Sequence, residues 1–273
     1  MADQSASKST KAPAPSADLE YESELWARGY SRVAGMDEVG RGSLAGPVSV
    51  GVAIVPDGTE LEVGGLIDSK ALSPSRRESM VPQISAWLEH SGGAVAVGHT
   101  QPEEIDSLGM TLALRLAAQR ALAALASRGF APDAVLLDGK HDWFTPPEPD
   151  LFGDLDPAQA HYALLAARAW GAAGATSAPE ELPVTMVIKG DYRCASIAAA
   201  SVVAKVERDE LMDSLDQQYP GYGWAKNKGY GSAAHRAALE AQGASVQHRL
   251  SWSLPLSDEQ REAAYAARAA EEN

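Results

Sequence analysis

Acidic side chains follow three apolar segments of this 273-residue chain, and they are the residues best suited to chemistry. Asp37 and Glu38 are adjacent and end the first segment. Asp138 and Asp191 each follow a later segment, and each is next to a glycine in the sequence. Functional sites in open α/β sheets gather at the carboxyl ends of the strands. If the three segments are neighbouring parallel strands, four carboxylates meet at one edge of the sheet.

Four carboxylates at one place repel one another unless positive charge neutralises them. Oxygen-only ligands without a nearby cysteine or histidine favour Mg²⁺ or Mn²⁺ over Zn²⁺. Two such ions stabilise the attacking and leaving oxygens in phosphodiester hydrolysis. Taken singly, each acid has a simpler explanation as a turn residue or, for Asp191, as a helix N-cap. Their joint occurrence favours the metal site.

A glycine-rich turn, Gly40-Arg41-Gly42, follows the first acidic pair. Neighbouring side chains of a regular strand point to opposite faces, so Asp37 and Glu38 share one ligand only if the strand ends or twists there. Glycine supplies that freedom. Because Arg41 lies between two residues without side chains, ligand atoms could approach the backbone closely. We interpret this stretch as half of a metal site joined to a loop that reads a ligand through its backbone.

The elements that must position these residues can be read from periodicity and turn signals. Expected strands cover residues 32–37, 47–55, 93–97, 134–137 and 183–188. Expected helices cover residues 18–29, 73–88, 102–127, 161–171, 195–215 and 233–242, and Ser257 with Gln260 forms a capping box for a last one. Pro82 should kink or shorten the second helix. Gly109 would cost about 1 kcal/mol relative to alanine if it is truly mid-helix.

The amino-acid composition narrows the classes of protein to which this chain can belong. Hydrophobic residues make up 45% of the chain, enough for a buried core, and no apolar stretch is expected to span a bilayer. A single cysteine, Cys194, excludes an internal disulfide and fits a cytoplasmic location. The net charge of −14 argues against a general nucleic-acid binder. A local basic groove is nevertheless expected, because several cations lie near the functional segments: Lys70, Arg76, Arg77, Lys189, Lys205, Arg208, Lys226 and Lys228.

Five motifs, taken in order, resemble those of the bacterial ribonuclease HII family over about residues 19–252. They are GMDEVGRGSLAGP, DSKALS, LLDGK, KGDYRCASIAAASVVAKVERD and NKGYGSAAH. The resemblance implies a ribonuclease H-like α/β fold, with a mixed central sheet flanked by helices and a C-terminal helical extension. It also implies cleavage of the RNA strand of RNA–DNA hybrids. Incision 5′ to a single ribonucleotide in duplex DNA, leaving 3′-hydroxyl and 5′-phosphate ends, is implied as well.

The resemblance assigns roles to particular residues. Two Mg²⁺ or Mn²⁺ ions would be held by the four carboxylates Asp37, Glu38, Asp138 and Asp191. The backbone of Gly40, Arg41 and Gly42 would contact the ribose 2′-hydroxyl. Tyr230 would stack on the next deoxyribose, and Lys70 would contact a phosphate. The chain departs from the family pattern at Asn227, where histidine is common, at Gly109, where asparagine is frequent, and in its long loop.

The domain reading is a disordered tail over residues 1–17, a catalytic domain over 18–252 with a long insertion loop at 140–182, and an acidic helix over 253–273. The expected partners are RNA–DNA hybrid and ribonucleotide-containing duplex DNA, with no membrane, and the expected state is a monomer. Two related families fit less well. Type I ribonuclease H spaces its first two carboxylates well apart, whereas Asp37 and Glu38 are adjacent. Ribonuclease HIII carries a sizeable N-terminal substrate-binding domain, which the tail over residues 1–17 is not expected to form. A nonhydrolytic hybrid-binding module is the alternative, although such a module gains nothing from carboxylates facing phosphate.

The remaining singled-out residues have simpler readings. Cys194 is expected to be a small buried residue. His141 and Asp142 are expected in a polar loop beyond the Asp138 strand. His235 and His248 are expected at a helix surface, with a phosphate contact as the alternative.

Overall fold

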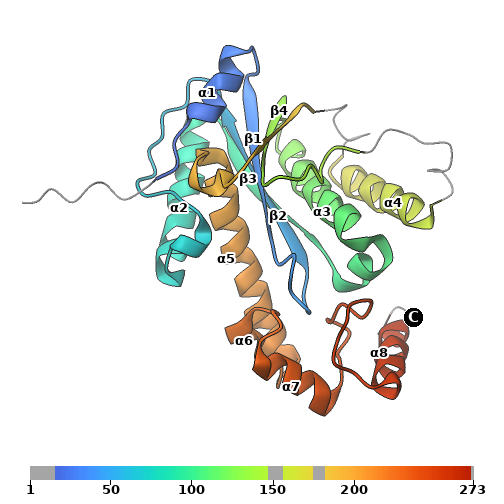
Figure 1. The fold of residues 1–273 in the computed structure, drawn as a ribbon. Coiled ribbons are helices and arrows are strands. Elements are labelled where there is room, and N and C mark those ends of the chain that lie inside the picture. The colour runs from blue at the N-terminus through green and yellow to red at the C-terminus, as the bar shows by residue number, and fades with distance from the viewer. Residues whose placement is uncertain (1–15, 147–155, 175–181, 272–273) are drawn as a thin grey trace, which may run out of the picture.

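A mixed five-stranded sheet in the order β3-β2-β1-β4-β5 forms the centre of the protein (Figure 1). The computed structural model describes residues 16–146, 156–174 and 182–271. β1 pairs in parallel with β4, and β4 with β5, whereas β2 is antiparallel to both β1 and β3. The strands are β1 (Arg32–Val39), β2 (Val48–Pro56), β3 (Ala94–Thr100), β4 (Ala134–Asp138) and β5 (Val184–Val187). The strands β1, β4 and β5 that precede the acidic residues are therefore parallel neighbours, which is the condition under which their carboxylates were expected to meet.

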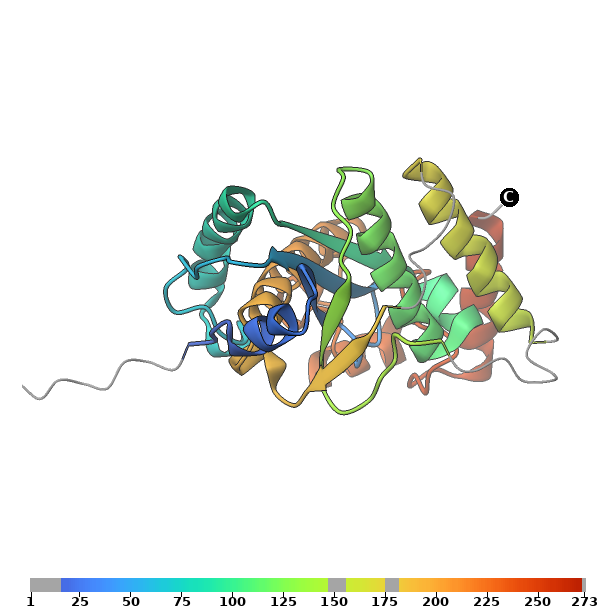
Figure 2. The ribbon, with the colours of Figure 1, turned by 90° about the horizontal axis from the view of Figure 1, so that it is seen from above.

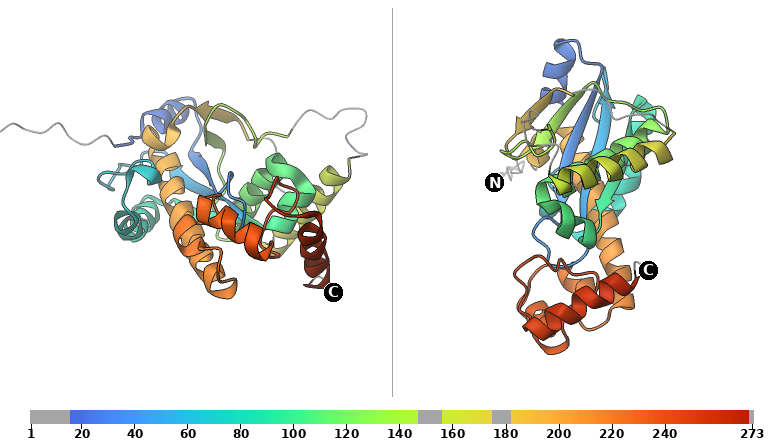
Figure 3. Two further views of the ribbon diagram at one scale, coloured as in Figure 1. Left: turned by 60° about the horizontal axis from the view of Figure 1, so that its bottom comes forward. Right: turned by 90° about the vertical axis from the view of Figure 1, so that its right-hand side faces the viewer.

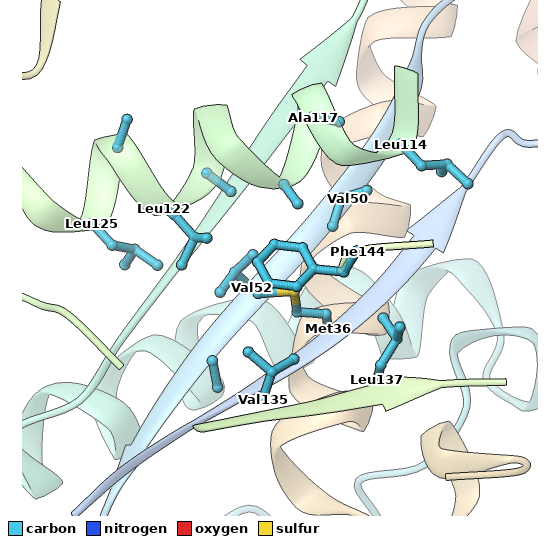
Figure 4. Close-up of a cluster of buried hydrophobic side chains, with 14 of the residues drawn as sticks. Met36, Val50, Val52, Leu114, Ala117, Leu122, Leu125, Val135, Leu137 and Phe144 are labelled. Atoms are coloured by element: carbon cyan, nitrogen blue, oxygen red, sulfur yellow. The ribbon is translucent and has the colours of Figure 1, made fainter. Parts of the chain in front are cut away.

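Helices cover both faces of this sheet, which explains why β1 and β2 are apolar on both sides (Figure 2). One face packs against α3 and α4, and Figure 4 shows Met36, Val52 and Leu122 meeting in that core. The other face packs against α2 and α5. The bounds are α1 (Glu20–Ala27), α2 (Pro74–Ser91), α3 (Pro102–Ala126), α4 (Pro157–Ala172) and α5 (Ala195–Gln218). The predicted mixed sheet flanked by helices is confirmed.

Small residues let α5 lie unusually close to the sheet. A Cβ atom added at Gly35 would lie 2.2 Å from the carbonyl carbon of Ser196, and one added at Gly51 would lie 2.3 Å from the carbonyl oxygen of Ala200. Neither position could carry a side chain unless α5 moved away. The close approach brings the side chains of α5 to the carboxyl end of β1.

The C-terminal extension forms a separate layer beyond the sheet edge, with its own apolar cluster (Figure 3). Its helices are α6 (Trp224–Asn227), α7 (Ala233–Gln242) and α8 (Asp258–Glu271). Leu44 and Ala45, from the loop after β1, belong to the same cluster. The loop that follows the first acidic pair is therefore held between the sheet and the extension.

Several expectations need correction. α2 continues through Pro82 to Ser91 and is not shortened. Gly109 is not a helical residue, because its φ of 72° and ψ of 166° break α3 at a kink, so the helical penalty does not apply. α4 begins at Pro157 and not at residue 161. Ala17 is buried and its amide donates to Leu66, so the tail predicted for 1–17 is ordered at its end. Residues 1–15, 147–155 and 175–181, on which parts of the tail and loop predictions fall, lie outside the described residues.

α3 is long and apolar enough to cross a bilayer by length and composition, contrary to the expectation from the sequence. In this structure 67% of its most apolar window is buried, as in the core helix of a globular domain. Its apolar character is thus used in packing against β2 and β3.

Candidate active site

The sheet brings three of the four predicted acidic positions to one edge. Asp37 lies near the end of β1, Asp138 is the last residue of β4, and Asp191 lies in the short 3-10 helix η3 (Gly190–Tyr192) that follows β5. Asp37 and Asp191 are buried, with 7% and 6% of their surface exposed. Glu38 follows Asp37 directly, and its side chain remains 19% exposed. All four predicted carboxylates therefore belong to one region.

The turn that carries Asp191 is tied to Asp138. The amide of Gly190 donates a 2.7 Å hydrogen bond to Oδ1 of Asp138. Lys189 adopts a left-handed φ of 56°, which turns the chain sharply after β5. A Cβ atom at Gly190 would lie 2.5 Å from Cδ1 of Ile197 on α5, so a larger residue here would have to displace the end of that side chain. The result is a tight connection that places two carboxylates side by side.

The four carboxyl groups hold their protons more tightly than isolated acids do. Burial, followed by the charges of Glu38 and Asp138, raises the pKa of Asp37 well above its usual value. Burial also raises the pKa of Glu38 against the opposing charge of Arg41. Burial raises the pKa of Asp138 although the Gly190 amide opposes it. For Asp191, burial and then Asp138 raise the pKa to about 6. Negative charge is therefore in excess at this edge.

The donor chemistry fits a hard divalent cation. Every candidate ligand offers carboxylate oxygens, which Mg²⁺ and Mn²⁺ prefer. A bound cation would offset both the burial of these charges, which is the main cause of the raised pKa values, and the repulsion among them. Across the described ranges, no three acidic, histidine or cysteine side chains are already arranged to hold an ion. The fit therefore rests on the kind and number of oxygens, and the side chains would have to converge on an ion.

A fifth carboxylate, Asp68, lies beside this group and was not singled out from the sequence. Its Oδ1 caps the short 3-10 helix η1 (Ser69–Ala71) by accepting from the amide of Lys70 at 2.8 Å. Asp68 is buried and contributes to the raised pKa of Asp191. Its place in the same short motif as Lys70 was the signal that could have found it.

Lys70 lies close enough to Asp37, Asp68 and Asp191 for their charges to act on its ammonium group. Burial acts to lower its pKa, but the charges of Asp37 and Asp68 outweigh that effect and raise it above the usual value. The ammonium group therefore stays charged at neutral pH, as a phosphate contact requires.

A pocket of ≈ 340 Å³ opens beside Asp37. Ser201 and Lys205 line it from α5, where their spacing places them on one helix face. The hydroxyl of Ser201 acts to lower the pKa of the Asp37 carboxylate, and it hydrogen-bonds the Ser69 hydroxyl at 3.1 Å. No local pattern in the sequence indicated that Ser201 would reach the site, because its contact depends on how closely α5 packs on the sheet.

Tyr230 lines this pocket, and the Gly40-Arg41-Gly42 turn lies beside it. Ser43 forms an isolated β-bridge with Tyr230, and a Cβ atom on Gly42 would lie 3.9 Å from the tyrosine ring. The Tyr230 side chain is exposed. Asn227 shapes the turn before it, since its Oδ1 accepts from the amide of Gly229 at 2.9 Å. The structure thus unites two predicted substrate contacts that are distant in sequence.

The expected basic groove is largely a set of internal ion pairs. Lys205 pairs with Asp209 at 2.5 Å, and Lys228 pairs with Asp213. Arg208 is completely buried. The two ion pairs line a groove of ≈ 560 Å³ between α2, α5 and α6, which is mixed in charge. These cations stabilise the fold more than they create a basic surface.

The minor predictions have mixed outcomes. Cys194 is fully buried, and burial raises the pKa of its thiol, as expected for an inert residue. Asp142 accepts from the amides of Phe144 and Thr145 in a polar turn. The helix-surface prediction for His235 and His248 is wrong, because both are buried with their Nε2 atoms 3.1 Å apart.

Comparison with known proteins identifies the relatives of this chain. The family model described as Ribonuclease HII matches residues 34–153 and 171–254. A ribonuclease HII of Streptomyces avermitilis is 43% identical over 224 residues, which cover 82% of this chain and 78% of the relative. The crystal structure of ribonuclease H2 from Pyrococcus horikoshii aligns with a TM-score of 0.55 at 25% identity, over 86% of this chain and 99% of that one. Bst-RNase HIII in complex with Mn²⁺ shares the fold, with a TM-score of 0.55 at 18% identity over 88% of this chain and 71% of that one.

Proposed function

This chain belongs to the ribonuclease HII family and is a ribonuclease H enzyme, and from that premise we propose that it cleaves RNA joined to DNA. It hydrolyses the RNA strand of RNA–DNA hybrids. It also incises 5′ to single ribonucleotides in duplex DNA and leaves 3′-hydroxyl and 5′-phosphate ends. The observation that carries this proposal is the convergence of four carboxylates and Tyr230. Asp37, Glu38 and Tyr230 line one pocket, and Asp138 and Asp191 lie close enough to raise the pKa of Asp37. The Gly40-Arg41-Gly42 turn lies beside the Tyr230 ring.

The carboxylates are the proposed metal ligands. Two Mg²⁺ or Mn²⁺ ions held there would activate water and stabilise the attacking and leaving oxygens of the phosphodiester. Asp37 and Asp138 lie on adjacent strands, so their backbone spacing is set by the sheet. Lys70 contributes a charged ammonium group beside them, which attracts phosphate without regard to base sequence.

The neighbouring turn and Tyr230 are the proposed ribose sensors. A 2′-hydroxyl both donates and accepts hydrogen bonds, and it is what distinguishes RNA from DNA at one position. Gly42 lets a sugar approach the backbone without a side chain between them. The exposed Tyr230 ring beside it would pack on the following sugar and disfavour a second hydroxyl there. Cleavage would thereby be linked to an RNA-to-DNA junction.

The test uses the full chain with two substrates, an RNA–DNA hybrid and a DNA duplex with one embedded ribonucleotide. Wild type should cleave both in Mg²⁺ or Mn²⁺ and neither in EDTA. Asp138→Asn should abolish cleavage while largely sparing binding, because it removes one negative charge but keeps the side-chain shape. Gel analysis of end-labelled strands reports cleavage, and fluorescence anisotropy reports binding.

A wild-type protein that binds both substrates but cleaves neither would favour the nonhydrolytic binding module. The same preparation tests the monomeric state by light scattering. We propose that the protein is a monomer located in the cytoplasm.

A further inference from the structure

Two fully buried arginines, Arg208 and Arg249, hold the turn formed by residues 40–46. Arg249 donates from Nη2 to the carbonyl of Gly40 at 2.7 Å, from Nη1 to that of Arg41 at 2.9 Å, and from Nη2 to that of Gly46 at 3.1 Å. One guanidinium therefore binds both ends of the turn. Its planar array of donors suits this task, and lysine could not reproduce it.

Arg208, on α5, links the same turn to the Tyr230 segment. It donates from Nε to the carbonyl of Pro47 at 2.9 Å and from Nη1 to the carbonyl of Lys228 at 3.0 Å. Its Nη2 reaches the Ser43 hydroxyl at 3.0 Å, and its Cζ lies 5.9 Å from the centroid of the Tyr230 ring. The two proposed ribose sensors thus share one buried support.

The Arg249 contacts determine where the amides of the turn point. In a trans peptide unit the carbonyl and the following N–H point in opposite directions. Drawing the Gly40 and Arg41 carbonyls inward therefore turns the amides of Arg41 and Gly42 outward. Within the described residues these two amides have no acceptor, whereas the next amides along the turn, those of Ser43 and Leu44, are bonded. Unbonded outward amides are donors that await a ligand oxygen.

Neither arginine has a carboxylate in hydrogen-bond or ion-pair contact within the described part of the chain. Buried charges are usually paired, so two cations neutralised only by carbonyl and hydroxyl oxygens are unusual. Burial, and then the charge of Arg208, lower the pKa of Arg249 to about 9, which still leaves it charged at neutral pH. Their positive field lies beneath the turn, where a sugar-phosphate backbone would pass.

We propose that Arg249 is a positioning residue for ribose recognition. It aims the Arg41 and Gly42 amides at the 2′-hydroxyl, while Arg208 holds Tyr230 in place beside the turn. This inference rests on the proposed function. It places the selectivity for ribose partly in a residue that the substrate never touches.

The test measures ribose selectivity in the cleavage-deficient Asp138→Asn background with Mg²⁺. The quantity is the ratio of Kd for an all-DNA duplex to Kd for the same duplex with one ribonucleotide. Arg249→Lys, which keeps the charge, should lower this ratio about tenfold. Arg115→Lys is the matched control, because Arg115 is also buried and donates to two loop carbonyls, those of Phe144 and Thr145, outside the turn and the pocket. It should lower Tm but leave the ratio unchanged.

An unchanged ratio in Arg249→Lys, with a Tm loss like that of the control, would overturn the inference and leave the proposed function standing. If Arg249→Lys does not fold, the Kd ratio of Arg208→Lys is measured in the same assay. An unchanged ratio in that variant also overturns the inference. A ratio of one before any arginine is changed overturns ribose sensing itself, and the inference with it.

Discussion

Tyr230 shows at the scale of one residue how position gives an ordinary side chain a specific role. Its backbone is fixed by the bridge to Ser43 and by His235, whose Nδ1 lies 3.0 Å from the Tyr230 carbonyl. Its ring remains exposed beside Gly42. A rigid backbone under an exposed ring is suited to stacking on a sugar, because little conformational entropy is lost on contact.

We expect Tyr230→Ala to reduce incision at a single ribonucleotide more than cleavage of a long hybrid, by at least about tenfold in the ratio of the two kcat/KM values. The reason is that a hybrid offers many ribose positions and needs no junction. Tyr265→Ala on α8 removes a similarly exposed tyrosine and should change neither rate. Equal losses on both substrates in Tyr230→Ala would refute the junction-sensing role.

At the scale of elements, the packing of α5 on β1 and β2 decides what reaches the pocket. The absent side chains of Gly35 and Gly51 let this helix approach until Ser201 influences the pKa of Asp37. The alanine-rich sequence of α5 permits this close packing. The identity of the side chains delivered to the site depended on the rotation of the helix about its axis.

Gly51→Ala should destabilise the protein by about 1–3 kcal/mol, the usual cost of overpacking a well-packed interior. The added methyl would press on the Ala200 carbonyl and displace Ser201, so activity should fall as well. Gly171→Ala in α4 is the opposite control, because no atom lies within 4 Å and alanine favours a helix by roughly 0.5–1 kcal/mol. Urea denaturation measures both, and a loss of stability in Gly171→Ala would contradict this account.

At the scale of the whole molecule, a buried histidine pair joins the extension to the sheet domain. The Nδ1 of His235 donates to the Tyr230 carbonyl, so its Nε2 is free to accept from Trp224 at 3.1 Å. The Nδ1 of His248 accepts from the Ser245 amide at 3.0 Å, and its Nε2 lies 3.1 Å from that of His235. Burial lowers the pKa of both rings, so both are neutral at pH 7, and Ala45, in the turn after β1, bridges to His248.

The stability that the neutral histidine pair contributes should therefore fall on acidification below about pH 6.5. Burial lowers the pKa of His235, and burial followed by the charge of His235 lowers the pKa of His248 to about 3. Arg236 and Arg268 act in the same direction. Between pH 6.5 and 3 these two histidines bind protons in the unfolded chain but not in the folded chain, so their contribution to the free energy of unfolding decreases as pH falls.

Urea denaturation at pH 7.5 and 5.0 checks this expectation. His248→Asn keeps an acceptor near the Ser245 amide but removes the titrating ring, so it should lose less stability on acidification than wild type. The exposed His90 on α2 supplies the control, since His90→Asn should follow wild type. Equal losses in wild type and His248→Asn would show that other groups govern the acid limb.

The sequence by itself determined the strands, most helices, the acid at three strand ends and the glycine turn, because each depends on local periodicity or on residues adjacent in the chain. It also indicated the family, because all five motifs occur in the chain in the order typical of that family. Only the tertiary structure decided that Arg208 and Arg249 support the turn, that Asp68 joins the acidic group, and that His235 and His248 are buried. Those roles depend on which distant segments meet, and long-range packing leaves no periodic trace in the chain.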